Sequence, residues 1–357
     1  MRLPRAILSL VTILTSLPAC ADERVVLVAG GNEPTASVAA QVKLLELFGV
    51  DIAADGKMYL IEMTGHRFSV ISPQGEFQAL AGNGKPGSGG DDGPAANAQL
   101  NGPHSLALTS KGDVYIADTW NHRVRRFEPG AGIIHPFAGT GEKGFGGDSG
   151  PAAKAMFGDV YCIAFDADDR HLLIADLDNR RIRSIDMQTS AVTTVAGNGQ
   201  KGIPKDGDSA TQSTLVDPRA VAADKQGNIY ILERGGHALR VVDAQGKIRT
   251  VAGTGKAGLS GDGGDALQAT LNGPKHLCVD RDGSVLIADS ENHVIRRYDP
   301  QTGKITRVAG TGKRGSVGLN GPPLELELDR PHGVYVSREG VLFISDSGNG
   351  RVLKIEK

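Results

Sequence analysis

Six positions with chemically useful side chains recur along the chain at an almost constant interval of 56 to 58 residues. They are Phe48, His104, Tyr161, Arg219, Lys275 and His332. Imidazoles ligate zinc or transfer protons, a phenol and a guanidinium donate hydrogen bonds, and an ammonium group attracts anions. Such a constant interval predicts a repeated structural unit that brings one residue per copy to a common binding surface.

Two short phrases define the repeat that carries these positions. An apolar residue followed by Ala-Gly occurs six times, starting at Val28, Leu80, Phe137, Val195, Val251 and Val308. Between these copies, an apolar run ends in a carboxylate, namely Glu62, Asp118, Asp176, Glu233, Asp289 and Asp346. Because a residue present in every copy suits a structural role, we expect these carboxylates to make hydrogen bonds in turns and at strand ends.

Each period of the repeat is typical of four short strands. Runs of about five β-branched and aromatic residues are bounded by Gly, Asp and Asn, as in antiparallel strands joined by tight turns. Six such periods predict an all-β, six-bladed β-propeller. The first strand of each blade lines a central channel in this fold, so we predict that the six positions above line the channel and bind a ligand there.

The two ends of the chain predict how the ring closes. The chain starts on an outer strand, residues 25–29, and ends after a third strand, residues 351–356. Neither end makes a complete four-stranded blade alone. We therefore expect the N-terminal strand to complete the last blade and to cover the edge of its sheet.

The loops between blades are rich in Gly and Asp, as residues 144–157 and 258–271 illustrate. Their Ala-rich second half predicts one helical turn, with Asp or Ser as the N-cap and Pro151 near the first helical position. Asp-Gly sequences also suggest calcium, but each loop offers too few carboxylates for a full set of oxygen ligands. We therefore expect turns and helix caps in these loops.

The repeated turns resemble those of the NHL repeat family. The resemblance rests on residues 116–118 (Ile-Ala-Asp), 121–124 (Asn-His-Arg-Val) and 251–255 (Val-Ala-Gly-Thr-Gly), which are similar to phrases of bacterial exported NHL proteins. It covers residues 25–357 and implies the propeller fold. Because one propeller fold hosts many activities, the resemblance implies no particular activity.

His104 and His332 each follow a proline, which is similar to the peptidylglycine α-amidating lyase propeller. That family holds zinc with three histidines in Pro-His contexts on alternate blades, so the resemblance implies His104 and His332 as metal ligands. The third context reads Pro218-Arg219, and a guanidinium does not ligate zinc. Lactonase propellers use a carboxylate-rich calcium site, and the six positions supply no carboxylate. We expect no cofactor, with zinc or calcium at the two histidines as the alternative.

Residues 1–21 are predicted to be a signal peptide. Arg2 and Arg5 precede an apolar run, residues 6–17, that is too short to span a bilayer comfortably. The residues around Cys20 fit ordinary signal cleavage, and residues 17–20 also resemble a lipobox in which Cys20 would carry a lipid. We expect residues 22–357 to form one propeller domain of a secreted or periplasmic protein, with a lipid anchor at Cys20 as the alternative.

Charge and cysteine content narrow the choice of partners. Of the 39 basic residues, Arg2 and Arg5 lie in the leader, which leaves 37 basic against 41 acidic residues and no basic run. This composition argues against nucleic acid or an anionic membrane surface as a partner. Cys162 and Cys278 fall in predicted inner strands of different blades, where we expect two free buried thiols.

A complete repeat framework without a complete catalytic set favours a binding function. We expect a monomeric binding or scaffold module for a protein, peptide or glycan partner, with its site at the channel mouth. The alternative is a metal-dependent lyase or a lactonase or other hydrolase, with its site at the central channel.

Overall fold

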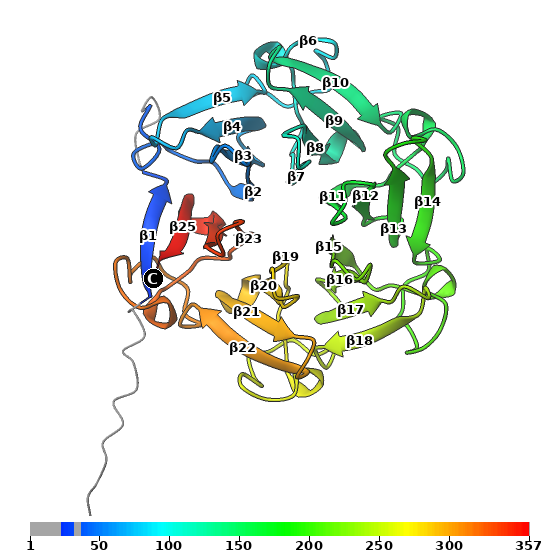
Figure 1. Cartoon of the computed structure of the whole chain (residues 1–357), viewed down its shortest axis with the longest axis vertical. Helices are drawn as coiled ribbons and strands as arrows, with labels where there is room; N and C mark the ends of the chain where they lie inside the picture. The colour runs from blue at the N-terminus through cyan, green and yellow to red at the C-terminus, as the bar shows by residue number, and fades with distance from the viewer. Residues whose placement is uncertain (1–22, 32–36, 357) are drawn as a thin grey trace, which may run out of the picture.

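A computed structural model describes residues 23–31 and 37–356 of the chain. The predicted signal peptide, with Cys20, lies outside the described residues. Figure 1 shows sheets arranged as blades around a central axis, with one strand of each blade nearest to that axis. The all-β, six-bladed propeller predicted from the repeat is therefore confirmed.

The four strands of each blade follow one another from the axis outward. The inner strands are β2 (Leu47–Ile52), β7 (Ser105–Leu108), β11 (Val160–Phe165), β15 (Pro218–Ala223), β19 (His276–Val279) and β23 (Gly333–Val336). The second strands are β3 (Met58–Glu62), β8 (Val114–Asp118), β12 (His171–Asp176), β16 (Ile229–Glu233), β20 (Val285–Asp289) and β24 (Leu342–Asp346). Within each blade, neighbouring strands pair antiparallel.

The outer half of each blade is built in the same way. The third strands are β4 (Arg67–Ile71), β9 (Arg123–Glu128), β13 (Arg181–Asp186), β17 (Ala238–Val242), β21 (Val294–Asp299) and β25 (Arg351–Glu356). The outer strands are β5 (Phe77–Ala81), β10 (Ile133–Ala138), β14 (Val192–Ala196), β18 (Ile248–Ala252), β22 (Lys304–Ala309) and β1 (Arg24–Ala29). A short strand, β6 (Gly93–Pro94), adds to β10 at the edge of the second blade.

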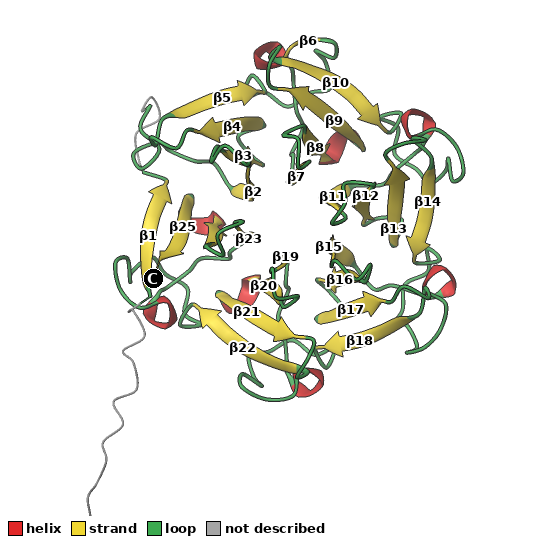
Figure 2. Cartoon of the chain, viewed as in Figure 1, coloured by secondary structure: helices red, strands yellow, loops and turns green. Residues whose placement is uncertain are grey.

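Short 3₁₀-helices are the only helices among the described residues, and Figure 2 shows them between the strands. Those in the loops between blades are η1 (Ala95–Asn97), η3 (Ala152–Lys154), η4 (Ala210–Gln212), η5 (Ala266–Gln268) and η7 (Pro323–Glu325). Those between second and third strands are η2 (Thr119–Asn121), η6 (Ser290–Asn292) and η8 (Ser347–Asn349). None of the described helices has the length and hydropathy to cross a membrane.

The N-terminal strand closes the ring, as predicted. β1 pairs antiparallel with β25, from Arg24 opposite Glu356 to Ala29 opposite Val352. Val25 and Ala29 are completely buried, because their side chains face the core between blades. The last blade therefore combines both ends of the described chain, which leaves no open edge at β25.

The repeated carboxylates serve the fold, which confirms their predicted structural role. Asp118 accepts hydrogen bonds from the backbone N–H of Asn101 and the side chain of Asn121, both at 2.8 Å. Asp289 accepts the equivalent bonds from Asn272 and Asn292, also at 2.8 Å. Asp118 and Asp289 thus tie the segment before an inner strand to the turn after the second strand, which fixes both at the same end of the blade.

The aspartates of the inter-blade loops bind arginines. Asp148 lies 2.7 Å from the guanidinium of Arg183, and Asp262 lies 2.8 Å from that of Arg296. Both guanidinium groups are completely buried, so arginines already engage the carboxylates of these loops. The same loops contain the predicted helical turns, and Asp265 caps η5 through the N–H of Leu267. Pro151 occupies the N-cap of η3 and not its first helical position, since the helix starts one residue later.

Candidate functional site

The six predicted positions share one backbone environment, where an inner strand begins. In β2, β11 and β15 the register with the second strand shifts at Phe48, Tyr161 and Arg219. A β-bulge of this kind adds one residue and redirects its side chain out of the regular alternation. His104 donates its backbone N–H to Ala117 just before β7, so it occupies the same place at the start of its strand.

Lys275 and His332 stand just before β19 and β23. Their backbone N–H groups donate to Ala288 and Ser345, the partners equivalent to Ala117 in the second blade. The repeat therefore places all six side chains at the same end of the inner strands. We call them the mouth cluster: Phe48, His104, Tyr161, Arg219, Lys275 and His332.

Side chains of the mouth cluster from five successive blades contact one another. Phe48 stacks on His332, with ring centroids 3.9 Å apart, and meets His104 edge-on at 4.8 Å. His104 meets the Tyr161 ring edge-on at 4.5 Å, and the Arg219 guanidinium lies 3.7 Å above the same ring. The structure thus unites these residues, as the spacing predicted.

Lys275 joins the mouth cluster through its charge. Its ammonium group lies 2.9 Å from the carboxylate of Glu291, and its side chain is largely buried. Burial lowers the pKa of Lys275 below its ordinary value, while Glu291 counteracts that shift. Burial also lowers the pKa of Arg219, to about 10, so its guanidinium is cationic at neutral pH.

The two histidines offer hydrogen-bond acceptors to the channel mouth. His104 Nδ1 lies 2.6 Å from the carbonyl oxygen of Gly102, and His332 Nδ1 lies 3.0 Å from that of Arg330. Because a carbonyl only accepts, each Nδ1 carries the proton and donates it. In the neutral rings, each Nε2 is then an acceptor for a hydroxyl or N–H group.

The neutral state of these histidines predicts a pH-dependent stability. Burial lowers the pKa of His104 and His332 well below the ordinary histidine value, and the charges of Arg219 and Lys275 lower it further. The unfolded chain therefore takes up protons near pH 6.5 while the folded chain does not, and stability falls as the pH drops below that value. We expect a His104→Gln/His332→Gln protein to be less stable than wild type at pH 7.5.

Urea unfolding at pH 7.5, 6.5 and 5.5 would check this expectation, because the stability gap between the two proteins should narrow as the pH falls. Phe48→Leu is the matched control: it disturbs the same ring contacts but removes no titrating group, so its gap should stay constant. If the difference in stability between the histidine variant and wild type also stayed constant with pH, this would contradict the conclusion that His104 and His332 are neutral in the folded protein.

Two further residues extend the mouth cluster, and sequence reasoning missed both. Trp120, the single tryptophan of the chain, lies 5.9 Å from the His104 ring, and Glu291 pairs with Lys275. They occupy equivalent positions in η2 and η6, and they pack over Gly102 and Gly273. Both glycines have a φ near +54°, and a Cβ there would lie under 3 Å from the side chain above. The signal in the sequence was a unique tryptophan inside a repeated turn.

The mouth cluster does not supply a complete zinc site. Catalytic zinc takes three protein ligands, and the described residues contain no group of three or more His, Cys, Asp or Glu side chains suited to a metal ion. On the third of the alternate blades the equivalent side chain is Arg219, which does not ligate metal. His104 and His332 as metal ligands stay a prediction, and metal analysis tests it below.

A cavity of about 290 Å³ lies further along the channel, lined by the inner strands of all six blades. Cys162 and Cys278 line it as free thiols, as expected. His276 accepts a 3.4 Å hydrogen bond from the N–H of Val334, and burial lowers its pKa to about 4. Asp51 accepts hydrogen bonds from Ile52 and Leu108, and burial raises its pKa to about 6. These groups therefore bind neighbouring blades to each other.

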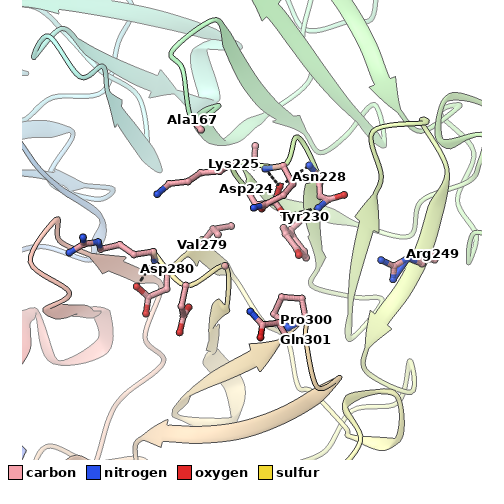
Figure 3. A pocket seen from close by; sticks show the side chains of 15 residues that line it. Ala167, Asp224, Lys225, Asn228, Tyr230, Arg249, Val279, Asp280, Pro300 and Gln301 are labelled. Atoms are coloured by element: carbon pink, nitrogen blue, oxygen red, sulfur yellow. Dashed lines mark hydrogen bonds between the residues drawn. The ribbon is translucent and has the colours of Figure 1, made fainter.

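A separate hollow of about 580 Å³ opens at the opposite end of the inner strands, between the hairpins of the fourth and fifth blades (Figure 3). Its acidic side chains already have partners. Asp224 bonds to Asn228 at 2.7 Å, and Asp280 bonds to Arg297 at 2.6 Å. Because these carboxylates already have partners within the protein, we consider the mouth cluster and not this hollow as the candidate ligand site.

Comparison with known proteins places the repeat in a family. The NHL repeat model matches residues 100–127, 271–298 and 328–355, and the teneurin NHL domain model matches residues 161–260. The first and third NHL matches include His104 and His332. Each matched repeat covers an inner strand and the two strands that follow it.

Three proteins illustrate the similarity. The chain is 27% identical over 281 residues to protein SUPPRESSOR OF QUENCHING 1, chloroplastic, of Arabidopsis thaliana, which covers 75% of this chain and 26% of that protein. It is 24% identical to human NHL repeat-containing protein 2, covering 85% of this chain and 45% of that protein. The chain thus spans less than half of these relatives.

A solved structure described as an auxiliary nutrient binding protein from Bacteroides thetaiotaomicron superposes with a TM-score of 0.68 and 16% identity, covering 94% of this chain and 76% of that chain. At this identity the likeness concerns the fold alone. The repeat matches and the bladed sheets agree, so the chain is a six-bladed β-propeller built from NHL-type repeats.

Proposed function

We propose that this protein acts outside the cytoplasm as a binding module that holds a peptide, protein or glycan partner at the channel mouth. One observation carries the proposal: the side chain at one shared position changes in nearly every blade, and its six copies gather in the mouth cluster, whereas the strand-end carboxylates repeat. A structural role would favour the same residue in each blade. Divergence at one shared position suits recognition of an asymmetric ligand.

The chemistry of the mouth cluster supports this kind of ligand. Phe48 and Tyr161 add aromatic rings to the mouth cluster, and such rings pack well against apolar surfaces of sugars or side chains. The Nε2 atoms of His104 and His332 accept hydrogen bonds from hydroxyl or amide groups. The predicted leader supports a location in the periplasm or outside the cell. The solved neighbour described as a nutrient binding protein is compatible with a binding role.

Binding to glycan and peptide arrays tests the proposal. We expect the wild-type protein to bind a defined subset of ligands, and a Phe48→Ala/His104→Ala protein to lose at least about tenfold in affinity, because two side chains at the centre of the site are removed. The control is Arg249→Met in the hollow at the opposite face. Equal binding by all three proteins would contradict a site at the channel mouth.

Metal analysis of the purified protein separates this proposal from a metal-dependent enzyme. We expect less than about 0.1 equivalent of zinc or calcium, since two imidazoles make an incomplete donor set. Stoichiometric metal that disappears in His104→Ala and His332→Ala would overturn the metal-free site. Each variant also needs a thermal unfolding curve close to that of wild type, so that metal loss is not confused with unfolding.

A further inference from the structure

Arg219 differs from every other buried arginine among the described residues. Arg125, Arg183, Arg240, Arg296 and Arg351 each lie within 4.0 Å of a carboxylate of the chain. The Arg219 side chain has no carboxylate within that distance in the described part, although only 6% of the residue is exposed. Its guanidinium lies 3.7 Å above the ring of Tyr161.

The acidic residue closest in sequence, Asp217, acts on the charge of Arg219 only from beyond ion-pair distance. Asp217 pairs with Arg234 at 3.1 Å and accepts from the N–H of Gly235 at 3.2 Å. A buried cation without a counter-charge costs several kcal/mol, which a stable fold normally avoids. The fold itself supplies five examples of the usual solution. Arg219 lacks such a partner among the described residues, so an anion from outside the chain could supply the missing counter-charge.

Lys275 makes the same region more positive. Its only ion-pair partner among the described residues is Glu291, whose side chain is 42% exposed. Arg219 and Lys275 occupy equivalent positions on adjacent blades, and their charges both lower the pKa of His104 and His332, so the four groups lie within electrostatic range of one another. The mouth cluster therefore contributes two cations, and among the described residues Glu291 supplies the one carboxylate within ion-pair distance of either of them. An anionic ligand group would balance this charge.

We propose that Arg219 and Lys275 form an anion-binding subsite that takes the carboxylate or phosphate group of the ligand, with the ligand body against Phe48, Tyr161 and Trp120. The inference rests on the proposed function and narrows it to acidic ligands. A guanidinium stacked on a ring keeps its N–H edge for planar oxyanions, and Lys275 adds a point charge. The histidine Nε2 atoms are left for hydroxyl or N–H groups of the same ligand.

The test uses benzoate and phenyl phosphate as anionic probes, with benzamide as the neutral probe of similar shape. We expect at least one anion to bind with a Kd below about 10 mM in calorimetry and to raise the melting temperature. Comparison of the two anions tells whether the subsite selects carboxylate or phosphate. Benzamide should bind at least about tenfold more weakly.

Arg219→Met and Lys275→Met should each weaken anion binding at least about tenfold, whereas Arg249→Met should not. In buffer without added anion, Arg219→Met should melt at the wild-type temperature or above it, because a buried unpaired charge has been removed. A melting temperature lowered by more than about 5 °C would show that Arg219 is structural, and this would overturn the proposal.

The remaining outcomes separate this inference from the proposed function. If benzamide binds as tightly as the anions, the channel mouth binds ligands but has no anion subsite, so only the inference fails. If neither anion binds below about 10 mM, the inference also fails, and the array experiment still decides the proposed function. If array binding is insensitive to the mouth cluster, the proposed function fails as well.

Discussion

A chain that begins at Gly30, and therefore lacks β1, is expected to lose the closed ring. The deletion removes the completely buried Val25 and Ala29 and leaves β25 as an unpaired edge strand. Burial of Val25 alone contributes about 2 kcal/mol, and the lost strand pairing adds to this. We expect the melting temperature to fall by at least about 5 °C, together with self-association through the exposed edge.

Thermal unfolding and light scattering would measure both effects. The matched control is a chain that begins at Glu23, which lacks the segment outside the described residues but keeps β1. Val25→Asp in the full chain offers a second route to the same defect, because it buries a charge in the core between blades. A chain starting at Gly30 that is monomeric and as stable as the control would contradict closure by β1.

Arg125→Met is expected to destabilise the protein by about 3–5 kcal/mol, as the loss of one partner of a buried ion pair usually does. The Arg125 guanidinium is completely buried and donates to the carbonyl oxygens of Gln99 at 2.7 Å and Gly89 at 3.2 Å. It also pairs with Asp91 and lies 3.7 Å from Asp118. Its loss would leave an inter-blade loop without its anchor.

The neighbouring residue on β9 provides the control for Arg125. Arg126 faces the other side of the strand, is 37% exposed, and reaches Asp113 and Glu128 only at 3.8 and 3.9 Å. Arg126→Met should change stability by less than about 1 kcal/mol, as for an exposed ion pair. Urea unfolding would measure the free energy of unfolding of both variants and of the wild-type protein. Equally small losses of stability in the two variants would mean that the ion pairs and hydrogen bonds of buried Arg125 contribute little beyond packing.

The sequence predicted the role of the repeated carboxylates but not the burial of the arginines that pair with them. The repetition of Asp118 and Asp289 at strand ends predicted a structural role, since every blade needs the same turn. The burial of Arg125, Arg183 and Arg296 was not predicted, because each pairs not only with the carboxylate at the end of the preceding strand but also with an aspartate in a loop about 35 residues away along the chain. A one-dimensional pattern gives no distance between a strand and a distant loop.

The sequence by itself determined that the fold has six blades and that the residues of the mouth cluster occupy the same position in each blade, because they recur at a nearly fixed interval. It also determined the closure by the N-terminal strand, because only the two ends together complete a blade. The tertiary structure alone decided which members touch. The stacking of Phe48 on His332 and the proximity of Trp120 depend on how blades from distant parts of the chain meet around one axis. The same holds for Arg219, which has no carboxylate within ion-pair distance in the described part of the chain.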